Sequence, residues 1–138
     1  MPAWSCPKCR RRFARSGQSH ECAPAMPLEE YFSTGPAHER PIFEAVVSAL
    51  REVGPVYVEP VSVGIFLKRS RTFAELRPMR KWVAVSFSLP HPAAHRLITR
   101  KVLHYSGRYF HVANVSGPGD IDPALRDLLT EAYLSSPE

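Results

Sequence analysis

The arrangement of its cysteines constrains this chain more than any other feature. All three cysteines lie within the first 22 residues, in the pattern Cys-x2-Cys-x10-His-x-Cys, and the remaining 116 residues contain none. Four thiolate and imidazole ligands that approach from two short arms suit the closed tetrahedral coordination of structural zinc. We therefore predict that residues 1–25 form a zinc knuckle with one zinc ion, held by Cys6, Cys9, His20 and Cys22.

Two other interpretations of the cysteines fit less well. The N-terminus has no apolar signal-peptide core, so we expect a cytoplasmic, reducing location in which an odd number of cysteines does not favour a disulfide. A redox Cys-x-x-Cys motif would need a buried strand before it, and the lead-in to Cys6 is too short for one. A segment of this size also lacks a core without metal, and we expect Trp4 and Phe13 to cover the metal cluster.

Positive charge is concentrated in the knuckle. Of the net charge of +5, a balance of +4 lies in residues 1–25, whereas residues 26–138 carry thirteen cations and twelve anions. Cations on a rigid knuckle are suited to the phosphates of nucleic acid, with little sequence preference. The alternative is that they keep a thiolate-rich segment soluble. The knuckle cations that we assign to nucleic-acid binding are Lys8, Arg10, Arg11, Arg12 and Arg15.

Hydrophobic periodicity indicates an α+β domain over residues 26–138. Apolar residues recur at helical spacing over residues 41–53, and again after Asp122, which is placed to cap a final helix. Alternation with a period of two indicates strands over residues 61–67, 83–89 and 108–115, with a shorter strand over 72–76. We predict a small antiparallel sheet packed by two helices, preceded by the zinc-bound knuckle.

Several segments of the chain resemble a bacterial family catalogued as domain of unknown function 5655. They are Tyr31-Phe32-x-x-Gly35-Pro36, the run from Val58 to Ile65, Phe73-Ala74-Glu75-Leu76 and Glu131-Ala132-Tyr133. Members of that family often begin with a similar Cys-x-x-Cys…His-x-Cys segment. The stretch from Cys6 to Phe13 also resembles the knuckle of zinc ribbons, in many of which glycine stands where this chain has Arg10. The family has no established activity, so the resemblance implies no catalytic residues, and related domains beside nuclease-like domains favour nucleic acid as a partner.

A second group of cations flanks the expected short strand. It is either a phosphate-binding rim, with Trp82 available for stacking, or a solvated hairpin whose charges discourage edge pairing. We include in the nucleic-acid hypothesis Lys68, Arg69, Arg71, Arg80 and Lys81. A further basic stretch in the long connection before the last strand is interpreted as a packed segment with a short helix near residues 95–103.

One strand face carries small residues among aromatic ones, which is unusual for a solvated surface. Either the long connection covers this face, or it is a ligand groove formed by Phe66, Trp82, Ser86 and His111. The sequence has no nucleophile motif or phosphate loop, and we assign no catalytic residue. Our leading hypothesis is an intracellular, non-enzymatic zinc protein that binds nucleic acid or acts as an adaptor. The alternative is a small-molecule sensor or enzyme that uses this face. No membrane partner is expected, while a protein partner and the oligomeric state are left open.

Overall fold

Six antiparallel strands form the main sheet, as seen in a computed structural model that describes residues 4–13, 16–17, 26–69 and 71–136. The strand order is β3-β4-β5-β6-β8-β7. In the order of the chain, the strands are β3 (Tyr57–Val61), β4 (Gly64–Lys68), β5 (Thr72–Pro78), β6 (Val83–Leu89), β7 (Leu103–Tyr105) and β8 (Arg108–Val115). The domain is therefore α+β, as predicted, with a larger sheet than the sequence suggested.

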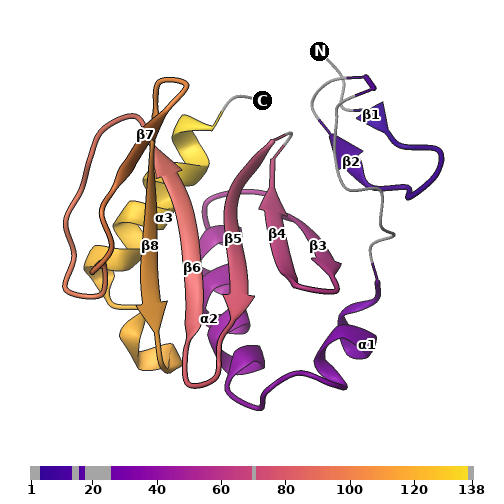
Figure 1. Cartoon of the computed structure of the whole chain (residues 1–138), viewed down its shortest axis with the longest axis horizontal. Helices are drawn as coiled ribbons and strands as arrows, with labels where there is room; N and C mark the ends of the chain where they lie inside the picture. The colour runs from indigo at the N-terminus through magenta and orange to yellow at the C-terminus, as the bar shows by residue number, and fades with distance from the viewer. Residues whose placement is uncertain (1–3, 14–15, 18–25, 70, 137–138) are drawn as a thin grey trace.

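Two long helices, α2 (Glu39–Arg51) and α3 (Pro123–Ser135), cover one face of this sheet (Figure 1). The buried residues of α2 include Ile42, Val46 and Leu50, which recur at the spacing that places side chains on one face of a helix. At the start of α3, the side chain of Asp122 accepts a hydrogen bond of 2.8 Å from the Leu125 N–H, as expected of a cap. The shorter helices are α1 (Leu28–Phe32) and the 3-10 helix η1 (Pro118–Asp120).

The expected strand over residues 61–67 is in fact a hairpin. Val61 ends β3 and is paired with Gly64, which begins β4, so the chain reverses at Ser62 and Val63. The alternation of apolar and small residues continues through this turn. The sequence pattern alone therefore does not show where β3 ends and β4 begins. The first half of the hairpin is a separate edge strand, Tyr57–Val61, which contains Pro60 and the charged Glu59.

Backbone hydrogen bonds attach other parts of the chain to the edge strand β3 and to β8. The Met26 N–H donates to the Pro60 carbonyl of β3 at 3.0 Å. The Asn114 N–H of β8 donates to the Leu97 carbonyl at 3.1 Å, so the connection runs along β8. The predicted short helix near residues 95–103 is not formed, because the described residues 90–102 contain no helix.

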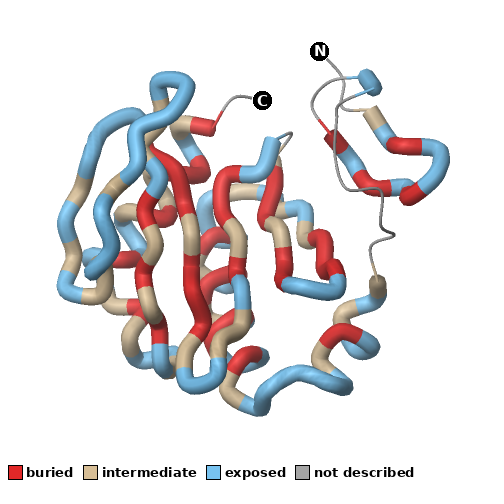
Figure 2. Tube along the Cα trace, viewed as in Figure 1, coloured by how far each residue is buried: buried red, intermediate tan, exposed pale blue. Residues whose placement is uncertain are grey.

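Figure 2 shows that burial is greatest along the central strands. No helix in the described ranges is long and apolar enough to cross a membrane.

We predict that Gly64→Ala destabilises the domain by about 1–3 kcal/mol, the usual effect of overpacking. A Cβ atom at Gly64 would lie 2.6 Å from the Leu76 carbonyl oxygen of β5, which is backbone and has little freedom to move. Urea unfolding measures the change. Gly119→Ala is the matched control, because a Cβ atom there meets nothing within 4 Å, and an equal loss in both variants would contradict the steric explanation.

Candidate nucleic-acid interface

The N-terminal knuckle is a short hairpin that ends in a tight turn. Strands β1 (Trp4–Ser5) and β2 (Arg12–Phe13) are paired in antiparallel fashion. Between them, the Arg10 N–H donates to the Cys6 carbonyl at 2.7 Å, and Arg10 adopts a left-handed backbone conformation with φ of +62°. This is the position at which many zinc knuckles carry glycine, the residue that adopts such a conformation at least cost.

Two of the four predicted zinc ligands lie side by side in this turn. Cys6 and Cys9 are buried and form a small cluster with Phe13, against which Trp4 packs. His20 and Cys22 lie outside the described residues, and the described part of the chain contains no group of three metal-ligating residues. Two buried thiols on one tight turn fit the Cys-x-x-Cys half of a structural zinc site.

A buried carboxylate joins the knuckle to the main sheet. Glu59 of β3 accepts a hydrogen bond from the Arg11 Nε at 3.0 Å, and its other oxygen lies 3.1 Å from the Lys68 Nζ of β4. The side chains of all three residues are at most 7% exposed. Lys68 also donates to the Arg12 carbonyl at 2.6 Å, so it contacts the knuckle directly. The knuckle is thus held by charged groups that are shielded from water.

Aromatic rings surround the two buried cations. The Lys68 Nζ lies 4.1 Å from the centre of the Phe13 ring, and the Arg11 guanidinium carbon lies 5.1 Å from the centre of the Phe66 ring. Burial lowers the pKa of Lys68, while the charges of Glu59 and, to a lesser degree, Cys9 act in the opposite direction. Both cations therefore contact aromatic rings as well as the Glu59 carboxylate.

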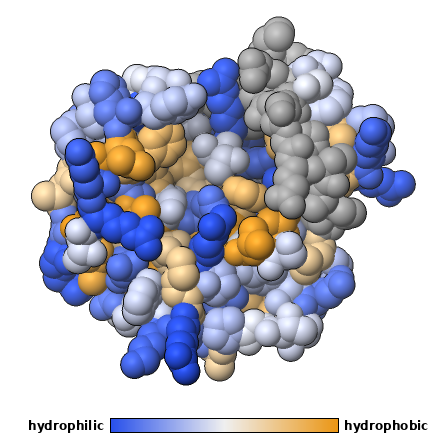
Figure 3. Space-filling model, viewed as in Figure 1, coloured by the Kyte–Doolittle hydropathy of each residue, from blue (hydrophilic) through white to orange (hydrophobic). Residues whose placement is uncertain are grey.

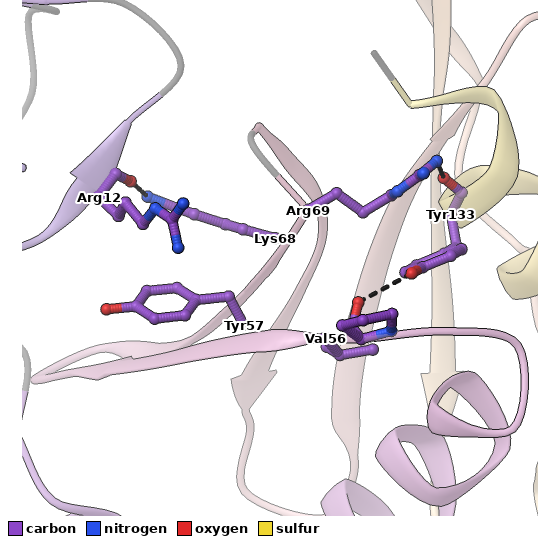
Figure 4. Close-up of a pocket in the computed structure, with 7 residues that line it drawn as sticks. Arg12, Val56, Tyr57, Lys68, Arg69 and Tyr133 are labelled. Carbon is purple, nitrogen blue, oxygen red and sulfur yellow. Dashed lines mark hydrogen bonds between the residues drawn. The ribbon is translucent and has the colours of Figure 1, made fainter. Parts of the chain in front are cut away.

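A cleft of about 370 Å³ opens beside this junction (Figure 4). Arg12, Tyr57 and Lys68 lie on one side of it, and Arg69 lies on the other, next to Tyr133. The Arg12 guanidinium carbon is 5.7 Å from the centre of the Tyr57 ring, which is 40% exposed. The cleft therefore combines three cations with an accessible aromatic ring.

The far wall of the cleft is fixed by α3. The Arg69 Nη1 donates to the Tyr133 carbonyl at 3.1 Å, and its guanidinium carbon lies 4.6 Å from the centre of the Tyr133 ring. The Tyr133 hydroxyl in turn donates to the Pro55 carbonyl at 2.8 Å. These contacts hold the Arg69 side chain at the wall of the cleft.

The structure separates the other cations that the sequence grouped together. Lys8 and Arg10 are exposed on the knuckle, and Arg15 lies outside the described residues. Arg71 is exposed just before β5 begins. The exposed residues Arg80 and Lys81 follow the far end of β5, roughly 20 Å along the strand. Arg11 and Lys68 are buried, so the surface that these ten residues offer is centred on Arg12 and Arg69.

The four residues of the proposed ligand groove do not share one face. Phe66 and Ser86 are on the face turned away from the helices, where hydrophobic and hydrophilic side chains are interspersed (Figure 3). His111 pairs with Phe87 and stacks on its ring at 5.2 Å on the core side, where the Ala93 N–H donates to its Nε2. Burial lowers the pKa of His111. Trp82 lies in the turn before β6 and is half-buried.

The face opposite the helices carries a shallow groove. Its volume is about 90 Å³, and it lies over β5, β6 and β8 beside Glu75, Ser86 and Phe110. The long connection does not close this groove, because it follows the edge of β8 through the Asn114–Leu97 hydrogen bond. Sequence reasoning missed Glu59 and Tyr57, although a lone carboxylate between Val58 and Pro60 in an apolar strand was a signal of a buried charge.

Comparison with known proteins adds one finding. A family model described as a domain of unknown function (DUF5655) matches residues 28–136. The matched range contains the six-stranded sheet with its helices and excludes the knuckle. No curated protein and no solved structure matches the chain.

We predict that Glu59→Gln weakens the attachment of the knuckle by about 3–5 kcal/mol, since it removes the buried negative charge that both Arg11 and Lys68 contact. Hydrogen exchange at the Arg12 amide, which donates to the Glu59 Oε2 at 3.4 Å, reports the attachment directly. Urea unfolding gives the accompanying loss of stability.

The matched control is Glu75→Gln. Glu75 is a strand carboxylate whose partner Arg77 is 52% exposed, and such pairs contribute about 1 kcal/mol or less. Exchange at Arg12 that responds equally to both substitutions would show that Glu59 has no special part in holding the knuckle.

Proposed function

Because the chain belongs to the family described as a domain of unknown function (DUF5655), a description that specifies no activity, we propose a function from the geometry. The protein binds single-stranded nucleic acid in the cleft between the knuckle and the sheet, through phosphate contacts and base stacking. The observation that carries this proposal is the cleft itself, in which Arg12 and Arg69 flank the exposed ring of Tyr57.

The chemistry of the cleft suits a flexible, charged strand. Arginine side chains bind phosphate oxygens through a planar fork of donors, and aromatic rings stack on bases regardless of sequence. The guanidinium of Arg12 lies over the Tyr57 ring, so a phosphate and its neighbouring base meet complementary groups close together. Among the described residues that line the cleft there is no asparagine or glutamine, which supports binding with little sequence preference.

The proposal includes one structural zinc ion, which stabilises the folded knuckle. In it, Cys6, Cys9, His20 and Cys22 hold one zinc ion, whose role is to fold the segment that carries Arg12. The left-handed Arg10 and the two buried thiols support this assignment.

An adaptor function is the second candidate, and a different surface supports it. The hairpin of β7 and β8 exposes three large hydrophobic side chains, namely Leu103, Tyr105 and Phe110, at 62%, 73% and 42%. Contiguous exposed hydrophobic residues are typical of protein-binding surfaces. This hairpin lies at the opposite edge of the sheet from the knuckle, so the two activities are compatible in one molecule.

We predict that Arg12→Ala combined with Arg69→Ala weakens binding to oligothymidylate and flattens its dependence on salt. On single strands, each lost phosphate contact reduces the slope of log K against log salt by about 0.7. Fluorescence anisotropy at several salt concentrations measures both the affinity and the slope.

The matched control is Arg100→Ala combined with Lys101→Ala. This pair removes the same charge from an exposed part of the long connection that does not line the cleft. Equal losses in the two double variants would attribute binding to net charge alone, and an absence of binding at low salt would refute the proposed function.

We predict one zinc ion per chain in protein purified without chelator, and its loss in His20→Asn and Cys22→Ser. Because each variant leaves the site one ligand short, elemental analysis should show a large drop in bound zinc. His104→Asn is the control, since His104 is exposed on β7 and stacks on Tyr109, away from the knuckle. Unchanged zinc in all three variants, or none in the parent protein, would exclude the assigned ligands.

A further inference from the structure

Glu39 is a buried carboxyl group at the first residue of α2. The whole residue is 0% exposed to solvent. The Tyr31 hydroxyl donates a hydrogen bond to its Oε2, whereas its Oε1 has no hydrogen-bond partner among the described residues. Buried polar groups are nearly always paired, so an unpaired carboxyl oxygen needs an explanation.

Glu39 is one of the residues that line a cavity of about 360 Å³. The walls include the apolar residues Met26, Pro36 and Pro78, and also Thr34 and Ser62, which carry hydroxyl groups. Gly35, which also lines the cavity, lies next to the unpaired oxygen, because a Cβ atom at that position would lie 3.0 Å from Oε1. The unpaired oxygen and the open space therefore occur at the same place.

The charge of this site is not balanced within the described chain. Burial raises the pKa of Glu39, although the hydrogen bond from Tyr31 and the neighbouring His38 act in the opposite direction. The described residues form no ion pair with Glu39, even though cations are abundant elsewhere in the chain. A buried carboxylate without a counter-charge is costly, and a bound cation would supply that charge.

The geometry selects among cations. A guanidinium group binds a carboxylate best through both oxygens, but Tyr31 already occupies the Oε2 of Glu39. An ammonium group needs only one carboxylate oxygen and can donate its other protons to hydroxyl groups such as those of Thr34 and Ser62. The apolar walls suit a short hydrocarbon chain attached to that ammonium group.

We propose that Glu39 and this cavity form a binding site for a small molecule with a primary ammonium group and a short apolar body. The site is independent of the nucleic-acid cleft, since β3 begins at Tyr57, which lines that cleft, and ends just before Ser62, which lines this cavity. It also differs from the groove considered for Phe66 and Ser86, with which it shares no lining residue.

The test is a titration of the full chain with n-butylamine, followed by NMR of backbone amides and of the Glu39 side-chain carboxyl carbon. We expect saturable shifts at Glu39, Thr34 and Ser62. n-Butanol and butyrate, which match its length without its charge, should bind at least tenfold more weakly. Glu39→Gln should lose at least tenfold in affinity, because it keeps the oxygen that accepts from Tyr31 but removes the negative charge.

Glu44→Gln is the matched control, since Glu44 is an exposed carboxylate on the same helix, paired with Arg40, and should leave the affinity unchanged. Gly35→Ala is the second variant. It preserves the carboxyl group but crowds Oε1, and it should weaken butylamine binding even if Glu39→Gln fails to fold. Absent saturation, equal binding of n-butanol, or full affinity in folded Glu39→Gln or Gly35→Ala would each overturn the proposal.

Discussion

The position of the knuckle depends on one carboxylate, that of Glu59, which binds a cation from each side of the junction. Arg11 comes from the knuckle and Lys68 from the sheet, and neither is free to turn to solvent while this contact holds. Buried ion pairs add little net stability compared with apolar packing, but they are specific, because any displacement leaves a charge unpaired. That specificity places the Arg12 backbone against Lys68, and with it one wall of the cleft.

Helical periodicity was the most informative part of the sequence. The apolar spacing over residues 41–53 and the Asp122 cap located α2 and α3 correctly, since each helix buries one continuous stripe. The strands were harder to delimit. A tight turn at Ser62 and Val63 interrupts neither hydrophobicity nor alternation, and β7 has only three residues, all exposed. The number of strands in the sheet therefore depends on strand pairing, which cannot be predicted from local sequence patterns.

The candidate site was only partly visible in the sequence, because charge does not reveal burial. Arg11 directly precedes β2 and Arg12 begins it, and the side chain of the first is buried in the junction while that of the second is exposed. Lys68 is buried because it contacts both Glu59 and the Arg12 carbonyl at the junction. His111 was assigned to the ligand groove with Phe66 and Ser86, but its pairing with Phe87 places it on the core side of the sheet. Such assignments require the strand register, which is a tertiary property.

The hydrogen bond from Met26 to the Pro60 carbonyl has a consequence for how this protein behaves at high concentration. An edge strand with unpaired backbone groups is a template for association with another sheet. On β3, Pro60 has no N–H to offer and its carbonyl is already occupied, while the opposite edge, β7, is only three residues long. Neither edge can support a long intermolecular ladder, so the architecture itself resists open-ended sheet polymerisation, whatever its ligands.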